Sequence, residues 1–117
     1  MPDTTRIYYN PSCSKCRLTK ELLAEKGIEP EVVEYLNTPP SKAELTEILA
    51  MLKLKPRELM RTHEAEYKDN NLNDDGLTDD QLIDAMIKYP KLIERPIVIN
   101  NGKAAIGRPP EKILDIL

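Results

Sequence analysis

The 117-residue chain contains no Trp and no Phe, and five Tyr residues supply all of its aromatic side chains. Proteins that bind single-stranded nucleic acid stack bases on exposed aromatic rings, so this composition argues against that function. An excess of positive charge is also missing, because the net charge is -3 and the pI is about 5.2. The chain has no general attraction for phosphate backbones, and we expect no nucleic-acid partner.

Long apolar runs are missing as well. No stretch approaches the roughly 20 apolar residues that cross a bilayer. The first apolar run, 7–9, is too short for the central region of a signal peptide. We therefore expect a cytoplasmic monomer with no membrane partner, in a compartment where structural disulfides are rare.

The first third of the chain predicts a βαβ unit. Residues 7–9 form a predicted strand, a helix begins at about Ser14 and stops at Gly27, and residues 31–35 form a second strand. A strand, a helix and a strand in this order imply two parallel strands. The residues expected on the inner face of the helix are Leu18, Leu22 and Leu23.

Only helices are predicted for residues 41–90. Ser41 and Thr78 each have Glu or Gln three residues later, which is the pattern of a capping box at a helix start. Pro56 suits the first position of a shorter helix. The polar residues 68–75 are predicted to form a loop.

The last part of the chain predicts a hairpin and a helix. Apolar residues 97–99 and the segment 103–106 flank Asn100-Asn101-Gly102, which is a strong hairpin signal. The turn at 107–110 then leads into a last helix. Its residues expected to face inward are Ile113, Leu114 and Leu117.

These elements predict an α/β fold with the order β-α-β, helical insert, β-β-α and a mixed four-stranded sheet. A chain of this length has room for one hydrophobic core. We therefore expect a single domain over residues 1–117, with residues 41–90 as a helical insertion within it.

The two cysteines lie together as Cys13-Ser14-Lys15-Cys16, between the first strand and its helix. Unpaired backbone N–H groups and the positive end of the helix dipole stabilise a thiolate at such a position. Lys15 and Arg17 add positive charge. We predict that Cys13 is an exposed nucleophile of low pKa, and that Cys16, one turn inside the helix, is placed to attack a bond formed at Cys13.

Three other interpretations of the cysteine pair compete with this one. Two buried apolar cysteines do not fit the hydrophilic surroundings, and a structural disulfide does not fit the compartment. A zinc site needs a second pair of ligands, and the sequence offers only His63. A redox or nucleophilic role is favoured, with no metal ligands predicted.

Arginines are the second candidate feature. Arg57 and Arg61 lie four residues apart on one predicted helix, Arg95 precedes Pro96, and Arg108 lies in the turn before the last helix. Several guanidinium groups around a thiolate would form a pocket for a tetrahedral oxyanion, because the guanidinium fork matches its geometry.

Four segments of the sequence resemble the glutaredoxin-linked arsenate reductases: Tyr8 to Arg17, Glu58 to Arg61, Glu94 to Val98, and Gly107 to Glu111. They follow the same order and extend over essentially the whole chain. The resemblance implies a thioredoxin-like fold and no bound cofactor. It also implies that Cys13 attacks arsenate, with glutathione as co-substrate.

The same resemblance assigns the oxyanion to Arg61, Arg95 and Arg108. Arg57 falls outside the family motif and is interpreted as a surface residue. The family hairpin further suggests a cis peptide bond at Arg95-Pro96.

The sequence departs from the family pattern at two positions. Tyr9 stands where family members with arsenate activity carry a His that assists thiolate formation, and Cys16 stands where Ser is common. A second cysteine could replace glutathione as the resolving thiol. The internal disulfide would then be reduced by glutaredoxin or thioredoxin, the two expected protein partners.

Two alternatives to the arsenate reductase interpretation remain. Redox-sensing regulators of the same fold bind RNA polymerase and use a similar pair of cysteines as a switch. The segment Arg108-Pro109-Pro110 and the lack of a basic tail favour the reductases. A general thiol oxidoreductase acting on glutathione adducts is the other alternative.

Overall fold

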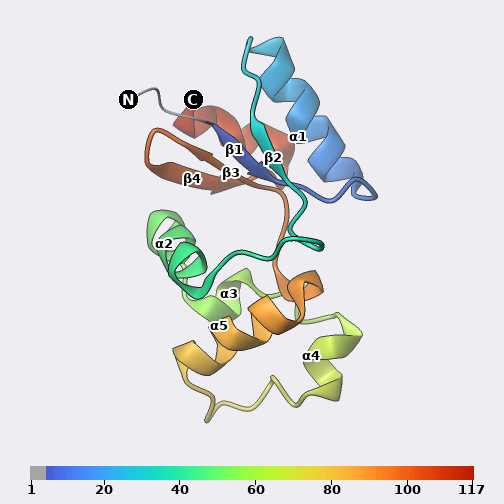
Figure 1. Ribbon diagram of the computed structural model, residues 1–117, viewed down its shortest axis with the longest axis vertical. Helices are drawn as coiled ribbons and strands as arrows, with labels where there is room; N and C mark the ends of the chain where they lie inside the picture. The colour runs from blue at the N-terminus through green and yellow to red at the C-terminus, as the bar shows by residue number, and fades with distance from the viewer. Residues whose placement is uncertain (1–4) are drawn as a thin grey trace. The chain divides into compact units, whose positions relative to one another are not determined.

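A mixed four-stranded sheet lies in the part of the chain that carries both cysteines (Figure 1). The structure is a computed structural model that describes residues 5–117. The sheet order is β2-β1-β3-β4, and its strands are β1 (Arg6–Tyr8), β2 (Glu31–Val33), β3 (Ile97–Asn100) and β4 (Lys103–Ile106). β1 is parallel to β2 and antiparallel to β3, which pairs antiparallel with β4. The predicted sheet is confirmed.

The chain divides into two compact units. One consists of the residues up to 38 together with residues 95–117, and the other consists of residues 39–94. The first holds the sheet, helix α1 (Ser14–Glu25) and the 3₁₀ helix η2 (Pro110–Ile116). The second contains the segment 41–90. The interpretation of that segment as an insertion within one domain stays a prediction.

The core of the first unit lies between the sheet, α1 and η2. Its fully buried members are Ile7, Leu23, Val98 and Ile113, one from each of β1, α1, β3 and η2. Ile7 and Val98 are paired across the antiparallel strands, so both point to the same face of the sheet. α1 and η2 therefore cover one face together.

The buried side of α1 differs from the prediction. Leu18 was expected to face inward, but 49% of it is exposed. The buried residues are Cys16, Thr19 and Leu23, which share a face at spacings of three and four residues. The resolving-thiol candidate thus lies on the core side of the helix.

The final helix also differs from the prediction. It is a 3₁₀ helix with three residues per turn, so residues three apart lie on one face. Ile113 is fully buried and Ile116 packs against the core. Leu114 and Leu117, which were predicted to face inward, are 40% and 39% exposed.

Both turns predicted from glycine are confirmed. Asn101 and Gly102 have φ of 54° and 73°, the positive values that a two-residue type I′ hairpin turn requires. Gly27, at φ 74°, follows the C-cap residue of α1 and adopts the left-handed conformation that commonly ends a helix.

The second unit consists of four α-helices, α2 (Lys42–Leu52), α3 (Pro56–Leu59), α4 (Ala65–Asp69) and α5 (Asp79–Lys88), and a 3₁₀ turn, η1 (Pro90–Leu92). Ser41 and Thr78 cap α2 and α5 with complete capping boxes, as predicted. The predicted loop 68–75 is wrong at its start, because Lys68 and Asp69 belong to α4.

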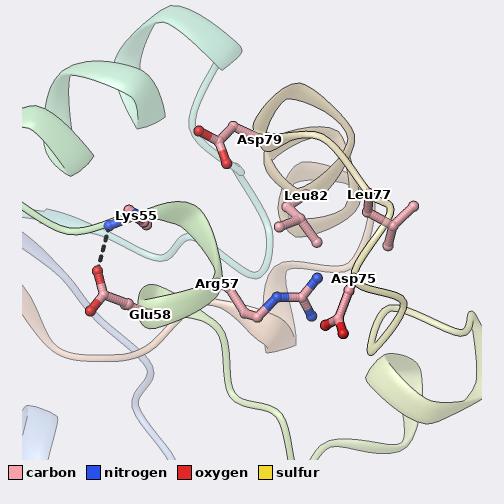
Figure 2. A pocket seen from close by; sticks show the side chains of 7 residues that line it. All are labelled: Lys55, Arg57, Glu58, Asp75, Leu77, Asp79 and Leu82. Carbon is pink, nitrogen blue, oxygen red and sulfur yellow. Dashed lines mark hydrogen bonds between the residues drawn. The ribbon is translucent and has the colours of Figure 1, made fainter.

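Arg57 is a structural residue in this unit, which corrects its interpretation as a surface residue. Its guanidinium donates to the Tyr67 hydroxyl (2.5 Å) and to the carbonyls of Leu72 (2.6 Å) and Asp74 (2.9 Å). Figure 2 shows its side chain reaching from α3 toward the loop that carries Asp75. One cation thus satisfies acceptors on α4 and on the loop after it.

Replacing Arg57 by Ala is expected to destabilise the second unit. Hydrogen bonds from a charged donor contribute about 1.5–3 kcal/mol each, so we expect the free energy of unfolding to fall by at least about 2 kcal/mol. Denaturant unfolding measures the loss, and hydrogen exchange of residues 67–76 locates it. Lys91→Ala, at an exposed position, is the control. Equal stability of the two variants would contradict the assignment.

Candidate active site

The loop between β1 and α1 is shaped by Asn10. Its side-chain Oδ1 accepts a hydrogen bond from the Ser12 N–H (2.9 Å), which is an Asx-turn, and its carbonyl accepts one from the Cys13 N–H (2.9 Å). The Tyr9 N–H donates to the Val33 carbonyl (2.8 Å), which continues the sheet to the start of the loop. The chain is thereby turned so that α1 starts directly after Cys13.

Cys13 is the N-cap residue of α1, and Cys16 lies at the third helical position. Cys13 is 7% exposed and Cys16 is 0% exposed. Cys16 is the more shielded of the two, as predicted. The prediction of an exposed Cys13 is wrong, because arginine side chains also contact this sulfur.

The surroundings of Cys13 favour its thiolate. Burial by itself raises the pKa of the thiol, but the backbone N–H of Cys16, the Arg95 guanidinium and the Cys16 thiol together outweigh burial and lower the pKa to about 7. The side chain of Cys13 makes no regular cap hydrogen bond. The Cys16 N–H nevertheless stabilises the negative charge of the thiolate.

The surroundings of Cys16 have the opposite effect. Burial raises its pKa, a hydrogen bond to the backbone of Asn10 lowers it, and the neighbouring Cys13 sulfur raises it further, to about 12. A negative charge on Cys13 disfavours a second one nearby. Cys16 is thus a protonated thiol whenever Cys13 is a thiolate.

Two of the three predicted arginines lie at Cys13. An Nη2 of Arg108 lies 3.9 Å from the Cys13 sulfur. Arg95 interacts with the same sulfur: burial lowers the pKa of this guanidinium, but Cys13 and the neighbouring Tyr35 more than offset it, so the net direction is upward. The Arg108 Nε also donates to the Arg95 carbonyl (2.7 Å), which links the two arginines directly.

Both arginines precede a cis peptide bond. The cis bond at Arg95-Pro96 is confirmed. A second one, at Arg108-Pro109, was not predicted.

Arg61 lies in the second unit, where acidic side chains surround it. Its Nε donates to Glu64 (3.0 Å), its Nη1 donates to Glu94 (3.1 Å), and its Nη2 lies 3.0 Å from the ring of His63. Only 11% of the Arg61 side chain is exposed. Its predicted role in oxyanion binding stays a prediction.

Within residues 5–117, no group of three or more His, Cys, Asp and Glu side chains is arranged to hold a metal ion. Across the same residues, no helix combines the length and the apolar character that a membrane span requires.

The residues that sequence reasoning missed are those that shape the loop. Asn10 is not among the predicted site residues, although an Asn-Pro step after a strand is a recognised turn signal. The close approach of Thr19 to Gly107 had no local signal, because these two residues are distant in the sequence.

Comparisons with known proteins agree with this geometry. The model of the ArsC family matches residues 8–116. The protein YfgD of Escherichia coli K12, named as uncharacterized, is 53% identical over 118 positions, covering 100% of this chain and 99% of the relative. An arsenate reductase of Neisseria meningitidis serogroup B is 47% identical and both chains are fully covered.

The solved structure of an arsenate reductase from Vibrio cholerae has a TM-score of 0.96 and 50% identity, with full coverage of both chains. The resemblance to arsenate reductases found in the cysteine and arginine segments is therefore confirmed at the level of the family. This chain belongs to the ArsC family and has its thioredoxin-like fold.

Proposed function

We propose that this protein is an arsenate reductase with Cys13 as its nucleophile. The observation that carries the proposal is a single one: two guanidinium groups contact a cysteine sulfur at the start of a helix, and the pKa of that cysteine is lowered to about 7. A thiolate beside two arginines can both bind a tetrahedral oxyanion and attack its central atom. The arsenate reductases among the relatives support arsenate as that oxyanion.

In the first step the Cys13 thiolate attacks arsenic(V) of bound arsenate. A sulfur–arsenic bond forms, and one oxygen leaves as water after it has been protonated. The arginines hold the remaining oxygens and neutralise their charge as the bond forms. Arsenic stays in its +5 state at this point.

In the second step another thiol attacks the Cys13 sulfur. A disulfide forms, the sulfur–arsenic bond breaks, and its electron pair stays on arsenic, which leaves as arsenite in the +3 state. Two thiols lose two electrons together, and arsenic gains them. A reductant must then return two electrons to the disulfide before the next turnover.

We propose Cys16 as that second thiol. Its raised pKa results in part from the Cys13 thiolate beside it. Once Cys13 is bonded to arsenic, the negative charge lies on the arsenate oxygens beside the arginines and no longer on the sulfur next to Cys16, so this contribution weakens and Cys16 ionises more easily. Cys16 would thus become reactive only after the adduct has formed.

Tyr9 occupies the position of the family His, and we propose that the Cys13 thiolate forms here without such a His. Tyr9 packs against the core of the first unit, and its ring lies 5.5 Å from the Lys20 amine. The Cys16 N–H at the helix start, the Arg95 guanidinium and the Cys16 thiol lower the pKa of Cys13 without it. We propose glutathione with glutaredoxin, or thioredoxin, as the electron source.

A coupled assay tests the proposed function. Arsenate-dependent NADPH oxidation is measured with the glutathione–glutaredoxin system and, separately, with the thioredoxin system. Turnover with at least one system, and none for Cys13→Ser, is the expected result. Turnover with neither system would overturn the proposal and favour the redox-sensing regulator.

Cys13 and Cys16 are expected to differ strongly in reactivity. Alkylation of Cys13 should rise with pH around a midpoint near 7, since the thiolate is the reacting form. At pH 6 it should be several-fold faster than a free cysteine, because the larger thiolate fraction outweighs the lower nucleophilicity. Cys16 should stay unmodified in the native protein. Rates measured on Cys16→Ser and Cys13→Ser separate the two, and equal rates would refute the assignment.

Arsenate turnover without any external thiol should leave an internal disulfide. The protein is expected to lose the mass of two hydrogens and to release one arsenite for each disulfide formed, because the two cysteines supply both electrons. Mass spectrometry of intact and digested protein measures this. If Cys16→Ser releases arsenite as fast as the unchanged protein in the absence of glutathione, Cys16 is not the resolving thiol.

Arg95→Ala and Arg108→Ala are expected to weaken oxyanion binding and to raise the pKa of Cys13. A charge-assisted hydrogen bond contributes about 1.5–3 kcal/mol, which corresponds to roughly tenfold to hundredfold in affinity. Arg→Lys keeps the charge but loses the fork, so it should recover only part of the loss. Protection of Cys13 from alkylation by sulfate measures both effects.

Lys103→Ala is the control, because it removes a positive charge from an exposed position at the start of β4, next to the hairpin turn. Arg57→Ala is unsuitable, since Arg57 stabilises the second unit. Arg61→Ala should weaken oxyanion protection without changing the pKa of Cys13, because Cys16 and Arg95, which lower that pKa, belong to its own unit. Unchanged protection in all three arginine variants would exclude an oxyanion pocket.

A further inference from the structure

We propose that Thr19 and Gly107 form a size-matched contact that positions Arg95 and Arg108 against Cys13. Thr19 lies on α1, which carries the two cysteines, and Gly107 lies between β4 and Arg108. The proposal rests on the proposed role of Cys13 and assigns two positioning residues to it. Neither residue touches the sulfur.

Gly107 has no room for a side chain. A Cβ atom built there would lie 2.5 Å from the Thr19 Oγ1, 3.3 Å from the Thr19 Cγ2 and 2.9 Å from the Pro96 Cγ. The φ of Gly107 is not in the positive range, unlike those of Gly27 and Gly102. Glycine is therefore required at this position by contact distance and not by backbone conformation.

Thr19 cannot easily move out of the way. It is fully buried, and its hydroxyl donates to the carbonyl of Lys15 one turn earlier (2.7 Å). A β-branched side chain in a helix has few rotamers available. The hydroxyl oxygen and the methyl group thus form a fixed surface against which the backbone at Gly107 is packed.

This contact is close to both arginines along the chain. The Gly107 N–H donates to the carbonyl of Pro96 (2.9 Å). This hydrogen bond connects the segment that carries Arg95 to the segment that carries Arg108. Arg108 follows Gly107 directly and holds the Arg95 carbonyl through its Nε. A shift of α1 relative to Gly107 would therefore move the cysteine sulfur away from both guanidinium groups together.

Gly107→Ala tests the contact. The added methyl group should force α1 and the Gly107 backbone apart, so the arginines withdraw from Cys13 and its pKa rises toward the free value. A rise from about 7 to about 8.5 reduces the thiolate fraction at pH 7 by roughly fifteenfold. The pH profile of Cys13 alkylation and its protection by sulfate are measured. Neither measurement depends on arsenate turnover, so a failed reductase assay leaves this test intact.

Gly102→Ala is the matched control. It lies at the other end of the β3–β4 hairpin, where an added Cβ meets nothing within 4 Å, and its φ of 73° makes the substitution destabilising. It lowers stability without crowding the contact. Its alkylation profile should remain that of the unchanged protein.

The double variant Thr19→Ala with Gly107→Ala should recover part of the Cys13 reactivity, since it removes two of the three crowding atoms. If Gly107→Ala does not fold, the pair Thr19→Ser and Thr19→Val takes its place. Ser keeps the hydroxyl and should preserve the profile, whereas Val replaces the hydroxyl by a larger methyl group and should raise the pKa. An unchanged profile in Gly107→Ala and in Thr19→Val, or an equal change in Gly102→Ala, would overturn the proposal.

Discussion

The rest of the site depends on one electrostatic constraint, which is a negative charge on a nearly buried sulfur. Burial of Cys13 disfavours the thiolate, so other groups must more than compensate for it. A helix start supplies one backbone N–H, and two guanidinium groups lie against the sulfur. Tyr8 is paired with Ile97, which is paired with Ile106, so the Asn10 turn and the segments that carry Arg95 and Arg108 all lie at the same end of the strands.

The same charge separates the roles of the two cysteines. They lie three residues apart, yet the pKa of Cys13 is lowered and that of Cys16 is raised. Part of the rise at Cys16 comes from the thiolate itself, so it depends on the state of Cys13. In the proposed reaction, bond formation at the first sulfur therefore removes one of the causes that raise the pKa of Cys16, while its burial, the larger cause, remains.

The arginines illustrate how one residue type acquires different roles from its neighbours. Arg57 and Arg61 are four residues apart in sequence, but Arg57 holds a loop through two carbonyls and a hydroxyl, whereas Arg61 is paired with two carboxylates. Arg95 and Arg108 contact a sulfur instead. Charge alone does not distinguish these cases, because the partner atoms determine what each guanidinium can still bind.

The sequence by itself determined the features that depend on neighbours a few residues away. The capping box at Ser41, the turn at Asn101-Gly102 and the position of Cys13 before a helix are local, and all three were predicted correctly. The resemblance added the cis bond before Pro96. Only the tertiary structure decided the exposure of Leu18 and the structural role of Arg57.

The tertiary structure also decided the burial of Cys13, the 3₁₀ form of the last helix and the fit of Thr19 against Gly107. Each of these depends on atoms that are distant in sequence. Periodicity identifies a helix but not which side meets the sheet, and a glycine in a turn gives no sign that a threonine methyl and hydroxyl fill the space beside it. Local backbone preferences are encoded residue by residue, whereas packing is settled only when distant segments meet.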